Sequence, residues 1–100
     1  LVLAVCLAAG LDGIRNKIMP PEGVCENVFD MGEEERKRRG IEALPSDLNE
    51  AIEELRKDEF IRGVLGEHIT DKYVKAKSAD WTAYRAQVTE WEVEEYLYKI

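Results

Sequence analysis

The sequence predicts an all-α fold, an irregular bundle of about five to six helices. Apolar residues recur at intervals of three and four along most of the chain, and no segment sustains an alternation of apolar and polar residues. No internal repeat interrupts this pattern. The chain of 100 residues is long enough for one small domain, so we expect residues 1–100 to form a single helical unit. Helices of unequal length joined by short loops favour an irregular bundle over a regular four-helix one.

The first predicted helix covers residues 1–17. It is apolar on all sides for two turns and then narrows to a stripe at helical spacing, formed by Leu7, Leu11, Ile14 and Ile18. We therefore expect it to be buried in something larger. Glycine lowers helix stability, so Gly10 and Gly13 suggest close packing against another backbone. Pro20 and Pro21 are expected to end the helix.

The beginning of the chain looks like a cut in a longer polypeptide. Leu1 is not an initiator methionine, and the apolar run it opens has no polar cap. Asp12, Arg15 and Lys17 interrupt this run well short of the ~20 apolar residues that span a bilayer. We expect no membrane partner.

Residues 20–32 are rich in Pro, Gly, Asn and Asp, and predict an extended loop pinned by isolated apolar residues. These anchors are Val24, Val28 and Phe29. A short polar helix should follow over residues 33–39, with acids at its start and bases at its end, and Gly40 should stop it.

Two helices are predicted over residues 47–57 and 58–65. Asp47 can cap the first, and Glu50, three residues on, can reach back to complete a capping box. Asp58 begins the second, and Gly66 ends it. The apolar stripes of the two helices are Leu48, Ala51, Ile52 and Leu55, and Phe60, Ile61, Val64 and Leu65.

The longest helix is predicted from Glu67 to about Ala86 or Val88. A last short helix should begin at a second capping box, formed by Thr89 and Glu92. Its apolar residues are Trp91, Val93, Tyr96, Leu97 and Ile100, an unusually apolar set for a chain terminus.

Charge and composition exclude several functions. The net charge of −7 opposes binding to a phosphate backbone, and the basic run at residues 36–39 is best interpreted as a solvated helix face paired with the preceding acids. Cys6 and Cys25 lack metal-binding or redox spacing, so we expect buried, reduced thiols of a cytoplasmic protein. The single histidine, His68, fits a helix start or the edge of a core.

Two runs of sequence resemble type I glutamine synthetase. Residues 7–21, LAAGLDGIRNKIMPP, are similar to the stretch that follows the last catalytic strands of that family. Residues 85–88, RAQV, followed by Trp91 and Glu92, look like the extreme carboxyl end of a bacterial member. The resemblance spans essentially the whole chain, in the right order.

This resemblance implies a fold and an activity. The chain would be the helical carboxyl-terminal part of the catalytic domain of an ATP-dependent glutamate–ammonia ligase, which uses Mg²⁺ or Mn²⁺. In that family the metal ligands, ammonia-site residues and phosphate-binding arginines precede the motif at Leu7. Residues 1–100 should therefore hold no catalytic, cofactor-binding or metal-binding residue and should be inactive alone.

The resemblance also implies two regulatory positions. Residues 27–31 are similar to the segment in which some members carry a tyrosine modified with adenylate, and here Phe29 takes that place without a hydroxyl. This departure favours the feedback-regulated subtype that is not adenylylated. In that subtype an acid before a tryptophan of the long helix takes part in glutamine feedback, and Asp80 precedes Trp81. The alternative for Asp80 is an ordinary acid on a helix surface.

The last helix has two interpretations. Its apolar residues could fold back on the core of this domain, or they could enter a neighbouring subunit. Family likeness favours the second, because type I enzymes are double-ring dodecamers locked by their carboxyl-terminal helices. The predicted subunit contacts are Trp91, Tyr96, Leu97 and Ile100. A nitrogen-responsive transcription repressor is a further partner implied for this end.

A different class of function stays open from composition alone. A free-standing acidic helical module could present Trp91, Tyr96 and Leu97 to the groove of a protein partner. The uncapped apolar run at the start of the chain favours the glutamine synthetase interpretation over this one.

Overall fold

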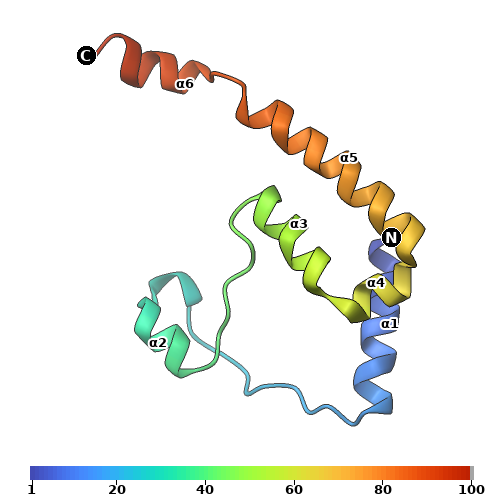
Figure 1. Ribbon diagram of the computed structural model, residues 1–100. Coiled ribbons are helices and arrows are strands. Elements are labelled where there is room, and N and C mark those ends of the chain that lie inside the picture. The colour runs from blue at the N-terminus through green and yellow to red at the C-terminus, as the bar shows by residue number, and fades with distance from the viewer. Residues whose placement is uncertain (100) are drawn as a thin grey trace.

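The computed structural model describes residues 1–99, and over this range the fold is all-helical, as predicted (Figure 1). Boundaries agree with the expected ones to within a few residues, which is the usual uncertainty at helix ends. The elements are α1 (Val2–Arg15), the 3-10 turn η1 (Val28–Asp30), α2 (Glu33–Arg38), α3 (Leu48–Lys57), α4 (Glu59–Leu65), α5 (Glu67–Arg85), α6 (Glu90–Glu92) and the π-helical turn η2 (Val93–Leu97).

Helix α1 ends before its two prolines are reached, which corrects the expected cause of termination. Lys17 adopts a left-handed conformation with φ 52°. The backbone N–H of Ile18 then donates to the Gly13 carbonyl at 2.9 Å, and that of Lys17 donates to the Ile14 carbonyl at 3.3 Å. This pair of bonds is a Schellman motif, which satisfies the last carbonyls of the helix. The helix has ended by Lys17, so Pro20 only prevents the helix from resuming.

Helix α2 forms where its charges predict it. Glu33 and Lys37 pair at 2.7 Å across one turn, and acids occupy the first turn while bases occupy the last. Gly40, with φ 69°, ends the helix by the same Schellman pattern, because the Ile41 N–H donates to the Arg36 carbonyl at 2.9 Å. The predicted role of Gly40 is confirmed.

The start of α3 differs in one detail from the predicted capping box. The Asp47 carboxylate accepts from the Glu50 N–H at 2.9 Å, as expected. The Glu50 carboxylate, however, accepts from the N–H and the hydroxyl of Ser46, both at 2.8 Å. Ser46 can donate two hydrogen bonds to one Glu50 oxygen, through its N–H and its hydroxyl. The backbone of Asp47 could donate only one. These bonds lower the pKa of Glu50, because they favour its charged form.

Helices α3, α4 and α5 pack against one another and contain the small core. Ile52 on α3, only 4% exposed, is the one apolar residue that is buried among the described residues. Thr70 on α5 is buried as well, and its hydroxyl donates to the Gly66 carbonyl at 2.9 Å, so no polar group is left unsatisfied there. Gly66, with φ 82°, permits the sharp turn between α4 and α5.

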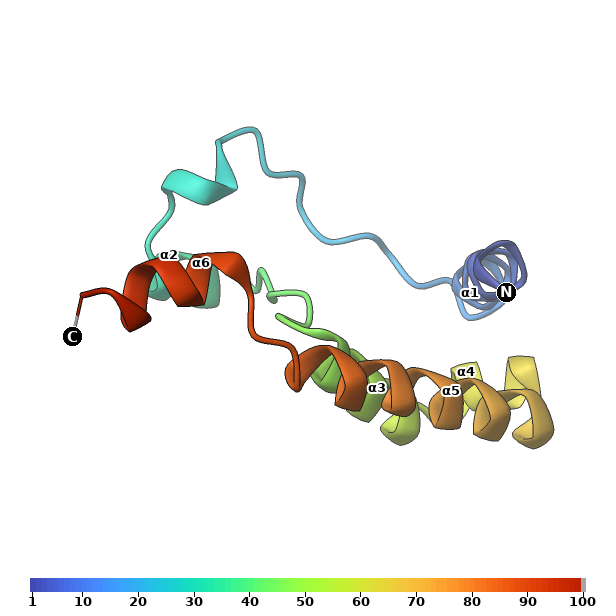
Figure 2. The same cartoon turned by 90° about the horizontal axis from the view of Figure 1, so that it is seen from above.

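The molecule is open beyond this core. Its radius of gyration is 18.7 Å, whereas a compact domain of this length has about 13 Å. Helix α1, viewed nearly end-on in Figure 2, packs against α4, and a long loop then leads away to α2. The apolar side chains Leu3, Leu7 and Ile14 of α1 remain exposed. Among the described residues, the helix that chiefly covers α1 is α4.

Several sequence-based expectations about burial are wrong for this chain. Cys6 and Cys25 are free thiols, but both are exposed. Phe29 is 96% exposed, so it does not anchor the loop. The space beside Gly10 and Gly13 is open, because no atom among the described residues lies within 4 Å of the place where a Cβ would stand. Each of these expectations required a neighbouring surface that residues 1–99 do not supply.

Candidate functional site

The last helix begins at the capping box that the sequence predicts. The Thr89 hydroxyl oxygen accepts from the Glu92 N–H at 3.2 Å, and the Glu92 carboxylate accepts from the Thr89 N–H at 2.8 Å. The N–H and hydroxyl of Thr89 lower the pKa of Glu92, since both donate to its charged form. This box gives the chain a defined new helix after the break at Ala86.

A π-helical turn, η2, follows the first turn of this helix. Hydrogen bonds that span five residues bring side chains five positions apart onto one face. Trp91 and Tyr96 are spaced in this way, and their rings meet edge to face with centroids 5.7 Å apart. Such aromatic pairs prefer this geometry. The sequence predicts a helix here but gives no sign of its wider turn.

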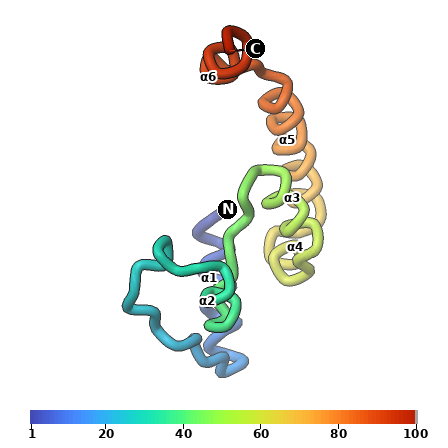
Figure 3. Tube along the Cα trace, turned by 90° about the vertical axis from the view of Figure 1, so that its left-hand side faces the viewer, coloured from blue at the N-terminus to red at the C-terminus, as the bar shows by residue number. Residues whose placement is uncertain are grey.

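Trp91, Tyr96 and Leu97 form what we call the terminal aromatic surface. All three are more than half exposed, at 61%, 56% and 65%. The segment that carries them lies beyond the end of α5, away from α3 and α4 (Figures 1 and 3). Among the described residues, this segment does not pack on α3 or α4. The fourth predicted contact, Ile100, lies outside the described residues.

Phe29 lies on η1, the 3-10 turn in the long loop. The Asn27 side chain organises this turn: its oxygen accepts from the Phe29 N–H at 3.2 Å, and its nitrogen donates to Asp30 at 2.8 Å. These bonds form an Asx-type turn. The turn holds the phenyl ring in solvent, and a side chain at this position would be accessible to an enzyme.

Asp80 lies on α5, whereas Phe29 lies on η1. Its carboxylate pairs with the Lys77 ammonium at 2.9 Å, one turn earlier. This contact raises the pKa of Lys77, mainly by the hydrogen bond and then by charge attraction. The Lys77 ammonium also lies 6.0 Å from the centroid of the Tyr73 ring. Asp80 is thus exposed and engaged in a local ion pair.

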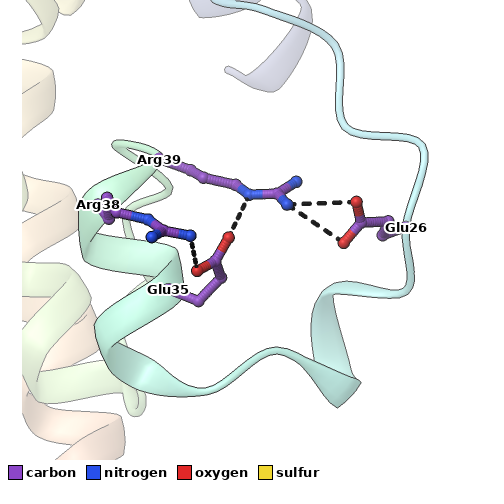
Figure 4. A network of polar contacts seen from close by, with 4 residues as sticks. All are labelled: Glu26, Glu35, Arg38 and Arg39. Atoms are coloured by element: carbon purple, nitrogen blue, oxygen red, sulfur yellow. Dashed lines mark hydrogen bonds and ion pairs between the residues drawn. The ribbon is translucent and has the colours of Figure 1, made fainter.

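A charged cluster joins α2 to the long loop (Figure 4). Glu35 accepts from Arg38 and from Arg39, the latter at 2.7 Å, and Arg39 also reaches Glu26, 13 positions earlier, at 3.2 and 3.3 Å. The two arginines lower the pKa of Glu35, because both donate to its carboxylate. Sequence reasoning identified the pairs within the helix but missed Glu26, since no local spacing relates it to Arg39.

The metal ions that the resemblance implies for the parent enzyme would need several ligands close together. No three His, Cys, Asp or Glu side chains in residues 1–99 gather as a metal site would require. Carboxylates such as Glu53 and Glu54 instead pair with Arg56 and Lys57 one turn later. Among these same residues, no helix has both the length and the apolarity that crossing a membrane demands.

The described residues thus define an all-helical segment with a small core, a terminal aromatic surface and an exposed loop, a class of structure in keeping with one part of a larger domain. Residues 1–96 match the family described as "Glutamine synthetase, catalytic domain", and the chain belongs to this family. The family resemblance inferred from residues 7–21 is confirmed.

Curated relatives agree with this family. Glutamine synthetase of Thermotoga maritima is 52% identical over 98 residues, which cover 98% of this chain and 22% of the relative. Those of Clostridium saccharobutylicum and Methanococcus voltae are 48% and 45% identical over 99% and 97% of this chain. The chain spans about a fifth of the length of these relatives.

Proposed function

We propose that this chain is the helical carboxyl-terminal segment of a glutamine synthetase that makes glutamine from glutamate, ammonia and ATP. The observation that carries the proposal is the family match over residues 1–96, together with relatives of that name that are about half identical over nearly the whole chain. Catalytic residues, the ATP site and the Mg²⁺ or Mn²⁺ ligands would come from other parts of the parent polypeptide, and the segment alone would be inactive.

Within that enzyme the segment would act as a scaffold and assembly element. The exposed apolar side chains of α1 would pack beneath the catalytic sheet, which accounts for their exposure in the chain alone. The terminal aromatic surface would contact a neighbouring subunit of a double-ring dodecamer. Exposed aromatic residues on a projecting helix are typical of such interfaces. We place the assembly in the cytoplasm.

Regulation would follow the feedback-controlled subtype. Phe29 lacks the hydroxyl that adenylylation requires, although its side chain is accessible on η1. Asp80 would contribute to inhibition by glutamine. The carboxyl-terminal end would also contact a nitrogen-responsive transcription repressor, for which the terminal aromatic surface offers the apolar residues.

The test is glutamine formation from glutamate, ammonia and MgATP. It compares the isolated 100 residues with the complete product of the gene that encodes them. Activity in the complete product alone is the expected result. Inactivity of both would contradict the proposal.

The second candidate, a free-standing acidic helical module, would become the better explanation if both samples were inactive. It is supported by one observation, the exposure of Trp91, Tyr96 and Leu97 away from the core. Such a module would bind a protein partner through this surface without any need for catalysis.

A further inference from the structure

The segment 19–26 has few attachments to the rest of the chain. Among the described residues, no backbone hydrogen bond joins it to another element. Its one polar side-chain contact with another element in residues 1–99 is that of Glu26 with the guanidinium of Arg39. That contact links partners 13 positions apart, whereas every other ion pair in residues 1–99 joins partners within five positions.

The partner of Glu26 is held in place from the other side. Arg39 is also bound by Glu35 through its Nε at 2.7 Å, and Glu35 in turn accepts from Arg38. A single exposed ion pair contributes little to stability, because forming it costs side-chain entropy and water screens it. Here Glu35 already orients the guanidinium of Arg39. The contact with Glu26 therefore costs less side-chain entropy.

The loop and α2 also border a hollow that is partly open to solvent. A cavity of about 580 Å³ lies between the loop and α2, lined by Glu22, Gly23, Val24, Glu35, Arg38 and Arg39. Glu26 makes the polar contact between this loop and Arg39, just before η1 begins. Figure 4 shows Arg39 reaching across this gap between the two backbones.

We propose that Glu26 and Arg39 form an electrostatic latch that closes the loop over α2 and sets the position of the turn carrying Phe29. Asn27 begins the Asx turn directly after Glu26, so the latch and the turn are continuous in the chain. Opening the latch frees residues 19–26 and leaves η1 attached to the fold only through the start of α2. Salt weakens an exposed ion pair, so the latch opens as ionic strength rises.

The test is hydrogen–deuterium exchange of the peptide covering residues 27–32, in which the N–H groups of Phe29, Asp30 and Met31 are hydrogen-bonded. It is measured by mass spectrometry on the complete gene product. The variant Glu26→Gln removes the negative charge of the latch, and with it the ion pair, and leaves the Glu35 pairs intact. The matched control is Glu22→Gln, which removes the same charge from the same loop and lines the same cavity but has no ion pair among the described residues.

We expect Glu26→Gln to speed exchange in this peptide by about two- to fivefold, the range that coupling of one oriented surface pair gives. Glu22→Gln should exchange like the unmodified protein. Raising the salt concentration should speed exchange in the unmodified protein and in Glu22→Gln, but not in Glu26→Gln. Equal exchange in all three proteins, or equal acceleration by both substitutions, would overturn the latch. Glutamine formation is not the readout, so this result is independent of the proposed activity.

Discussion

At the scale of single residues, Lys17 adopts a conformation that glycine normally occupies. Its φ of 52° forms the Schellman turn at the end of α1. A Cβ in this region costs about 1 kcal/mol. We expect Lys17→Gly to be more stable than Lys17→Ala by about that amount, since both lose the same charge and only alanine keeps the strain. Thermal unfolding of the complete gene product measures the difference. A more stable alanine variant would contradict the assignment of strain.

Phe29 provides a second test at this scale. The ring is exposed on η1, so its surroundings already allow access to a modifying enzyme, and the missing group is the hydroxyl. We expect Phe29→Tyr to accept labelled adenylate from ATP in the presence of an adenylyltransferase, while the unmodified protein stays unlabelled. Phe29 has no hydroxyl to accept the label. Label on the unmodified protein would therefore lie on another residue and would show that adenylylation acts there.

The effect of Asp80 on feedback must be distinguished from the effect of its ion pair with Lys77. The substitution Asp80→Ala removes both the carboxylate and its contact with Lys77, whereas Lys77→Ala removes the contact and keeps the carboxylate. We expect Asp80→Ala to raise the glutamine concentration for half-inhibition by at least about fivefold, the lower end of typical coupling between sites. Lys77→Ala should leave it unchanged. Inhibition curves of the complete gene product decide this, and an unshifted Asp80→Ala curve would support the ordinary surface acid.

At the scale of elements, the capping box makes the last helix sensitive to acid. The pKa of Glu92 is lowered from 4.5 in the folded chain, so its contribution to stability is present above that ordinary value and is lost as pH falls through the lower folded value. We expect helical NMR shifts of residues 89–97 in the 100-residue chain to decline from about pH 5 downward. In Glu92→Gln they should change much less over this range, because glutamine can still cap but does not titrate.

At the scale of the whole molecule, the projecting terminal aromatic surface should control assembly. Removal of a central aromatic contact from an interface commonly costs about 2 kcal/mol or more. We therefore expect Trp91→Ala to dissociate the complete gene product at concentrations where the unmodified protein stays assembled, as measured by analytical ultracentrifugation. The control is Glu94→Ala, an exposed position on the same segment. Identical sedimentation of all three proteins at every concentration would rule out this surface as a subunit contact.

Much of the local structure follows from the sequence because helices depend on near neighbours. Asp58 caps α4, Gly40 and Gly66 end their helices, and Thr89 with Glu92 starts the last one, all as predicted. Each of these features involves residues within a few positions of each other. The family could also be identified from short runs of residues, since the motif over residues 7–21 is itself local.

The sequence by itself therefore determined the helical class, most of the helix ends and the family of this protein. Only the tertiary structure decided which apolar side chains are covered, how the terminal aromatic surface projects, and that Glu26 reaches Arg39. The sequence predicted buried cysteines and an anchoring Phe29, yet these side chains are exposed. The physical reason is that backbone hydrogen bonds and caps form between neighbours in the chain, whereas burial and long-range ion pairs depend on which distant surfaces meet.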